Sequence, residues 1–90
     1  MLLSDEAVRL LSEQYEWSEQ GNAAFCSETA TDLAHSLKGV AANLGLVPLK
    51  EALAELVAVL RAKDEEAARR AYKKYWDNFC KLSQILQQNN

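Results

Sequence analysis

Apolar residues recur at alternating intervals of four and three along most of this 90-residue chain. That spacing is typical of amphipathic helices that bury one side. The longest such stripe comprises Ala68, Tyr72, Tyr75, Phe79, Leu82 and Leu86. Because the chain holds only three glycines and one proline, few positions can interrupt its helices. The pattern predicts an all-α fold.

Capping and breaking residues divide the chain into four segments. We expect helices at about residues 4–20, 28–44, 48–62 and 65–87. The candidate N-caps are Ser4, either Ser27 or Thr29, and Asp64. Gly45 is placed to end the second helix, and Pro48 suits the first turn of the third. Short loops imply antiparallel neighbours, so residues 1–90 are expected to form one domain, an antiparallel up-down-up-down four-helix bundle.

The first helix has the least regular apolar pattern of the four. Its inward residues are expected to be Ala7, Leu10, Leu11 and Tyr15, with Trp17 as a further candidate. The next two stripes comprise Ala30, Ala34, Leu37, Ala41 and Leu44, then Leu49, Leu53, Leu56 and Leu60. Tyr72, Tyr75 and Phe79 lie on the stripe of the fourth helix, so we interpret the aromatic residues as packing rather than as a ligand site.

The two cysteines are expected to carry free thiols. Cys26 lies at the start of the second helix and Cys80 well along the fourth, which separates them by on the order of 20 Å along the bundle. A disulfide requires Cα atoms within about 7 Å of each other. We therefore predict no intramolecular bridge.

The charge balance argues against nucleic acid as a partner. The formal net charge is −3, whereas binding to phosphates depends on an excess of basic residues. Four basic residues gather in the last helix, at Arg69, Arg70, Lys73 and Lys74. Glu65 and Glu66 precede the two arginines by four residues, so we interpret this face as solvated and partly ion-paired. With no apolar run of about 20 residues and no signal peptide, we expect no membrane insertion and a cytoplasmic location.

The only histidine, His35, lies off the apolar stripe and therefore faces solvent. Its own face carries Glu28, Thr31, Asp32, Lys38, Gly39 and Ala42. Gly39 costs a helix about 1 kcal/mol relative to alanine, and no turn is needed there because the stripe continues to Leu44. A missing side chain favours close approach of a partner. An imidazole nucleophile, the Lys38 ammonium and a cleared surface together suit the transfer of an anionic group.

Three other interpretations compete for this region. His35 could be an ordinary exposed surface histidine. The spacing of Asp32 and His35 is that of a carboxylate-histidine pair in a di-iron bundle, but such sites need two inward-facing pairs, so no metal site is expected. The chain also has no glycine-rich phosphate loop and no second histidine, which excludes a kinase or a catalytic triad.

The residues Ala34-His35, Leu37-Lys38-Gly39 and Leu44-Gly45 resemble the signature of the histidine-containing phosphotransfer (HPt) domains of multistep two-component phosphorelays. The expected number of helices also fits such a domain. The chain departs from the family at Val40, where serine is frequent. That position turns toward the bundle, so the departure removes only a hydroxyl that could bond locally.

The resemblance implies a phosphorelay intermediary without kinase or ATP-binding activity of its own. Nε2 of His35 would accept a phosphoryl group from an aspartate of one receiver domain and pass it to an aspartate of another. Lys38 would compensate the phosphoryl charge, and Gly39 would let the partner approach. The domain would bind no cofactor, since the receiver would supply the Mg²⁺.

The expected partners are response-regulator receiver domains or a hybrid sensor histidine kinase. A docking surface around the ring would comprise Thr31, Asp32, Ser36, Ala42, Asn43 and Leu46. Each of these residues could equally pack or face solvent, and Asp32 either orients the ring or only favours the helix N-terminus. We expect a monomer, although the apolar face of the first helix leaves dimerisation open. The alternative function is a non-catalytic helical interaction module that has lost phosphotransfer.

Overall fold

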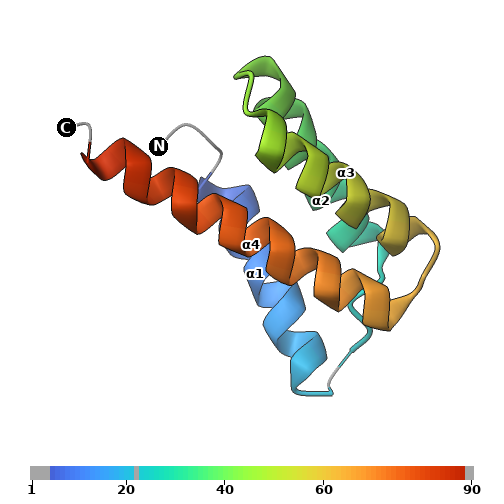
Figure 1. The fold of residues 1–90 in the computed structure, drawn as a ribbon. Coiled ribbons are helices and arrows are strands. Elements are labelled where there is room, and N and C mark those ends of the chain that lie inside the picture. Colours follow the sequence, from blue (N-terminus) through green and yellow to red (C-terminus); the bar gives the residue numbers. More distant parts are fainter. Residues whose placement is uncertain (1–4, 22, 89–90) are drawn as a thin grey trace.

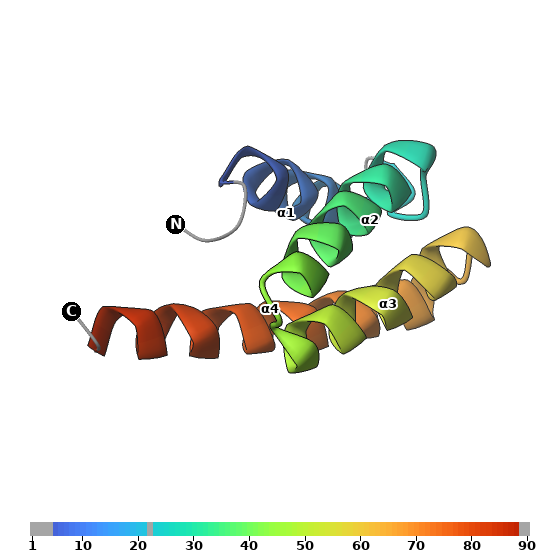
Figure 2. The ribbon, with the colours of Figure 1, turned by 90° about the horizontal axis from the view of Figure 1, so that it is seen from above.

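A computed structural model describes residues 5–21 and 23–88 of the chain, and this part contains four α-helices and no strand. The helices are α1 (Asp5–Glu19), α2 (Glu28–Asn43), α3 (Val47–Arg61) and α4 (Glu65–Gln88). Every bound lies within one residue of the expected position. Consecutive helices run in opposite directions (Figures 1 and 2). The predicted all-α antiparallel bundle is therefore confirmed.

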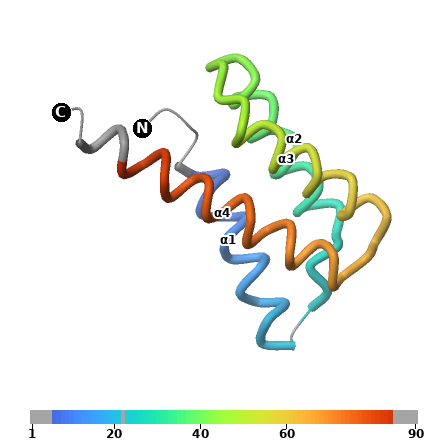
Figure 3. Tube along the Cα trace, in the orientation of Figure 1, coloured from blue at the N-terminus to red at the C-terminus, as the bar shows by residue number. Residues whose placement is uncertain are grey.

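The helices form two layers, with α1 beside α2 in one and α3 with α4 in the other (Figure 2). The most extensive contacts join α2 to α3 and α3 to α4. The Cα trace shows α2 and α3 side by side along their length, and the 24-residue α4 extends past the turn between them (Figure 3). Helix α2 is therefore held between α1 and α3, with one side left open.

Side chains cap two of the helices as expected. Ser27, rather than Thr29, is the N-cap of α2, and its hydroxyl accepts the backbone N–H three residues on at 3.1 Å. Asp64 is the corresponding residue of α4, where its carboxylate accepts the backbone N–H of Ala67 at 3.1 Å. Pro48 lies in the first turn of α3. The predicted cap at Ser4 lies outside the described residues.

Helix α2 ends in a Schellman motif centred on Gly45. This glycine has a φ of +73°, its N–H donates to the carbonyl of Ala42 at 3.2 Å, and the N–H of Leu46 donates to that of Ala41 at 2.9 Å. Helix α3 ends in the same motif: the N–H of Lys63 donates to the carbonyl of Leu60, and the N–H of Asp64 donates to that of Val59. Here the residue in the left-handed conformation is Lys63, with a φ of +60°. A residue with a Cβ is strained in that conformation, so the second turn stores strain that the first avoids.

The core is aliphatic between α2 and α3 and aromatic between α1 and α4. Tyr72, Tyr75 and Phe79 are buried, which confirms that they pack in the core. Tyr72 stacks on Tyr15 of α1, with the ring centroids 4.2 Å apart and the planes 14° from parallel. Phe25, from the connector before α2, meets both rings edge-on. The aromatic cluster thus fastens α1 to α4.

Trp17 and Leu44, which we expected in the core, are exposed, and Leu10 is only half-buried. The side chain of Leu86, at the end of the last expected stripe, lies outside the described residues. Trp17 is 56% exposed, because it lies six residues, or about 120° around the helix, from the fully buried Leu11. Val8 and Ser18 are buried in α1 instead. Leu44 is 43% exposed. It is the C-cap of α2, and the chain turns away from the helix at the next residue, Gly45.

Candidate functional site

His35 lies in the middle of α2, on its open side. The residues that face the core are Ala30, Ala34, Leu37 and Ala41. His35 and Ser36 are exposed, whereas Lys38 is half-buried on the flank of the helix. Because consecutive helical turns carry His35 and Lys38, the ammonium group lies on the same side of the bundle as the imidazole. The imidazole is thus accessible to a macromolecule, on a helix that packs against both α1 and α3.

The bundle gives no reason for a glycine at position 39. Gly39 is exposed and helical, and a Cβ built on it would meet no atom within 4 Å. A side chain would therefore fit against the present fold. Since alanine also favours a helix more than glycine does, stability alone would select a larger residue at this position. The packing of the bundle therefore does not require a glycine one turn from His35.

The expected docking residues do not all share one surface. Asp32, Ala42 and Asn43 are exposed on α2. Thr31 is half-buried, and its hydroxyl donates to the carbonyl of Ser27 at 2.8 Å. Leu46 packs against the core and lines a separate apolar groove between the start of α3 and the C-terminal half of α4, together with Pro48, Leu49, Asn78, Lys81 and Leu82.

The structure brings two basic residues to this region that the sequence analysis missed. Arg61, in the last turn of α3, and Lys63, in the turn that follows, border a depression whose other wall contains Thr31 and Asp32. They follow His35 by more than 25 residues along the chain, so no local pattern connects them with it. The expected antiparallel arrangement of α2 and α3 could have predicted their position, since it places the end of α3 beside the start of α2.

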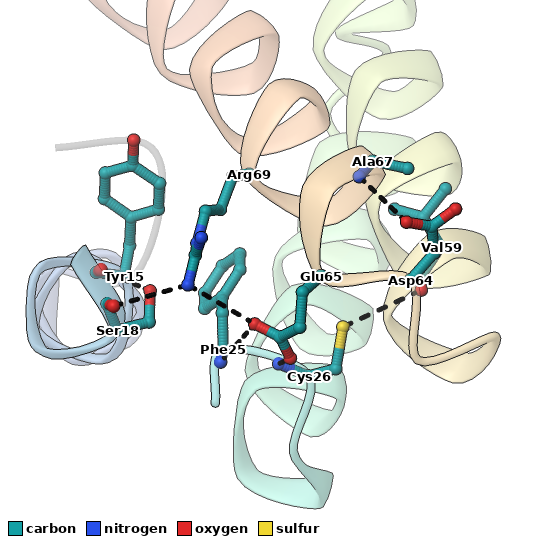
Figure 4. Close-up of polar contacts among 9 residues, drawn as sticks. All are labelled: Tyr15, Ser18, Phe25, Cys26, Val59, Asp64, Glu65, Ala67 and Arg69. Carbon is teal, nitrogen blue, oxygen red and sulfur yellow. Dashed lines mark hydrogen bonds and ion pairs between the residues drawn. The ribbon is translucent and has the colours of Figure 1, made fainter. Parts of the chain in front are cut away.

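A carboxylate on α4 fixes the connector that precedes α2 (Figure 4). Glu65 accepts the backbone N–H of Phe25 at 2.8 Å and that of Cys26 at 2.7 Å. Burial acts to raise the pKa of Glu65, but these backbone bonds outweigh it and the pKa is lowered. Arg69 lies 3.8 Å from the carboxylate and donates to the carbonyl of Ser18 at 3.3 Å. Glu65 thereby ties the connector before α2 to α4, and Arg69 ties the end of α1 to α4.

The other charged and thiol groups predicted from the sequence are arranged as expected in the part of the chain that the structure describes. The expected ion pairs of Glu65 with Arg69 and of Glu66 with Arg70 are present, at 3.8 and 3.5 Å. Cys26 and Cys80 are free thiols, as predicted. Burial, followed by the hydrogen bond with Glu65, raises the pKa of Cys26 to about 11, so this thiol stays protonated at neutral pH. No helix among these residues is long and apolar enough to span a membrane.

Comparison with known proteins identifies the family of the chain. The family model for the Hpt domain matches residues 3–88, nearly the whole chain. No curated protein and no solved structure matches the chain significantly. Hpt domains are phosphotransfer intermediates of phosphorelays rather than kinases, and they interact with receiver domains. From the match over almost its full length, together with the four-helix bundle, we conclude that this chain belongs to the Hpt domain family.

Proposed function

We propose that this domain accepts a phosphoryl group on His35 from an aspartyl phosphate of one receiver domain and passes it to an aspartate of a second. The observation that carries the proposal is an exposed histidine beside an unexplained bare surface at Gly39, in a chain of the Hpt family. The lone pair of Nε2 attacks phosphorus in line. The bond from phosphorus to the aspartate oxygen breaks, and its electron pair leaves with the carboxylate. The second transfer reverses these steps on another receiver.

Positioning and charge compensation account for most of the catalysis of phosphoryl transfer. Helix α2 supplies the position, because packing against both α1 and α3 fixes the helix that carries His35. Lys38, which is half-buried, supplies a cation one turn away. Gly39 supplies clearance for the backbone of the partner. Asp32, one turn before His35, is exposed and either orients the ring or acts only on the helix.

The remaining groups that the reaction needs are assigned to the receiver. Mg²⁺ at the aspartyl phosphate would come with that domain, and it compensates the charge on the phosphoryl oxygens when bound. Within residues 5–21 and 23–88, no three His, Cys, Asp or Glu side chains are grouped to hold a metal ion. We likewise propose that the domain binds no ATP, and that it acts in the cytoplasm as a monomer.

Transfer of label from a phosphorylated receiver tests the proposal. The wild-type domain should acquire a phosphoryl group that is labile in acid and stable in base, as expected of phosphohistidine. His35→Gln should acquire none and still fold, because substitution of an exposed residue costs little stability. If the folded wild-type domain takes up no label from any receiver of the source genome, the proposal fails. The chain is then the non-catalytic interaction module.

A further inference from the structure

The depression beside His35 is bordered by opposite charges on its two walls. Glu28 and Asp32 stand on the α2 side, and Arg61 and Lys63 stand on the side formed by the end of α3. We propose that these four residues form a charge-matching surface that selects among receiver domains. The inference rests on the proposed function, since it concerns the partner that docks over His35.

The surface is continuous with the reacting group. Asp32 precedes His35 by three residues and Thr31 precedes it by four, so their Cβ atoms lie about 5–6 Å from that of the histidine. A receiver that places its aspartate over the imidazole buries on the order of 800 Å² of this domain. A footprint of that size extends well beyond one helical turn, so it covers the depression as well.

The four charges have no ion-pair partner among the residues that the structure describes. None of them forms a salt bridge with another described residue, whereas five other ion pairs are present, including those of Arg9, Arg69, Arg70, Lys74 and Lys81. Glu28 and Asp32 are also like charges four residues apart, an arrangement that destabilises a helix. The helix N-terminus favours Glu28, but Asp32 lies beyond the first turn and gains little from it.

The chemistry of the occupant follows from this arrangement. The matching receiver presents a lysine or arginine toward Glu28 and Asp32, and a carboxylate toward Arg61 and Lys63. Charges at the edge of an interface mainly set association rate and partner choice, because like charges brought together are strongly unfavourable. Receivers with the opposite arrangement are therefore rejected. The carboxylates and cations of the depression discriminate among receivers, while His35 and Lys38 perform the same reaction with any of them.

Charge reversal at Arg61 tests the inference. Initial rates of transfer would be measured at several concentrations of each phosphorylated receiver, at low and high salt, for the wild type, Arg61→Glu and Glu28→Lys. The matched control is Arg70→Glu, which makes the same change of charge on the outer face of α4, where the arginine side chain is 71% exposed. Phosphorylation of His35 by phosphoramidate, a small donor that needs no docking, reports on the nucleophile separately.

For the receiver that the wild type prefers, Arg61→Glu should raise KM by about tenfold at low salt, with kcat little changed and a smaller effect at high salt. Arg70→Glu should change KM by less than about twofold. Equal KM values for Arg61→Glu, Glu28→Lys and the wild type would overturn the inference and leave the proposed function intact. So would an equal rise for Arg70→Glu, which would indicate general electrostatic attraction. A wild type that phosphoramidate labels but no receiver does would overturn both.

Discussion

Removal of the Glu65 carboxylate should destabilise the bundle far more than its partial exposure suggests. Glu65→Ala breaks two short bonds to the backbone, at 2.8 and 2.7 Å, and leaves the N–H of the fully buried Phe25 without its acceptor. Hydrogen bonds to a charged group contribute roughly 1.5–3 kcal/mol each. Because the Glu65 side chain is 34% exposed, water can replace part of the loss. We therefore expect a total cost of about 2–3 kcal/mol, below the sum of the two bonds.

Thermal and urea denaturation followed by circular dichroism at pH 7 measures this cost. For a domain of this size, a loss of about 2–3 kcal/mol lowers Tm by roughly 10–20 °C. The matched control is Glu66→Ala, the next residue, whose side chain is 82% exposed and forms one ion pair at 3.5 Å. That change should cost under about 0.5 kcal/mol. If Glu65→Ala costs no more than Glu66→Ala, the bonds to the connector do not stabilise the fold.

The same carboxylate makes stability depend on pH in a predictable direction. The pKa of Glu65 is lower in the folded than in the unfolded protein. Its contribution to the free energy of unfolding is therefore fully present when the pH is above the ordinary glutamate pKa of about 4.3. It is lost as the pH falls through the lowered folded value. The difference in unfolding free energy between the wild type and Glu65→Gln should therefore be constant from pH 7 to about pH 5 and shrink below that. A constant difference down to pH 2 would show that the charge of Glu65 contributes nothing.

The helices and their caps could be predicted because the information is local. Ser27 and Asp64 cap residues three positions away, and the exposure of His35 follows from the spacing of its neighbours within one helix. The same reasoning fails at Trp17. Apolar residues occupy two sides of α1, and the spacing alone does not say which side meets the bundle. Only the packing of Tyr15 on Tyr72 decides it.

The parts of the site that join different helices could not be predicted. The sequence shows Glu65 as a first-turn carboxylate and a partner of Arg69, both of which the structure contains. The shorter hydrogen bonds of Glu65 join backbone N–H groups about forty residues earlier in the chain. A sequence pattern does not show which distant backbone groups a side chain will contact. Arg61 comes to the depression beside Asp32 in the same way, through the register in which α2 packs on α3. Side-chain types in one helix led to the proposed reaction, whereas helix packing determined which charged residues lie near His35.

Two further substitutions separate what the fold needs from what the site needs. Lys63→Gly should stabilise the domain by up to about 1 kcal/mol in urea denaturation, because glycine adopts the left-handed conformation at this turn without strain; a loss of stability would show that the lysine side chain holds the turn. Gly39→Ala should also stabilise it, by about 1 kcal/mol, since the added Cβ meets open space within an exposed helix. Transfer from a receiver should nevertheless slow for Gly39→Ala and slow much more for Gly39→Leu, while labelling of His35 by phosphoramidate continues. A more stable protein with slower transfer is expected only if the glycine is retained for the partner, so unchanged transfer in Gly39→Leu would show that the bare surface does not serve the approach of a receiver.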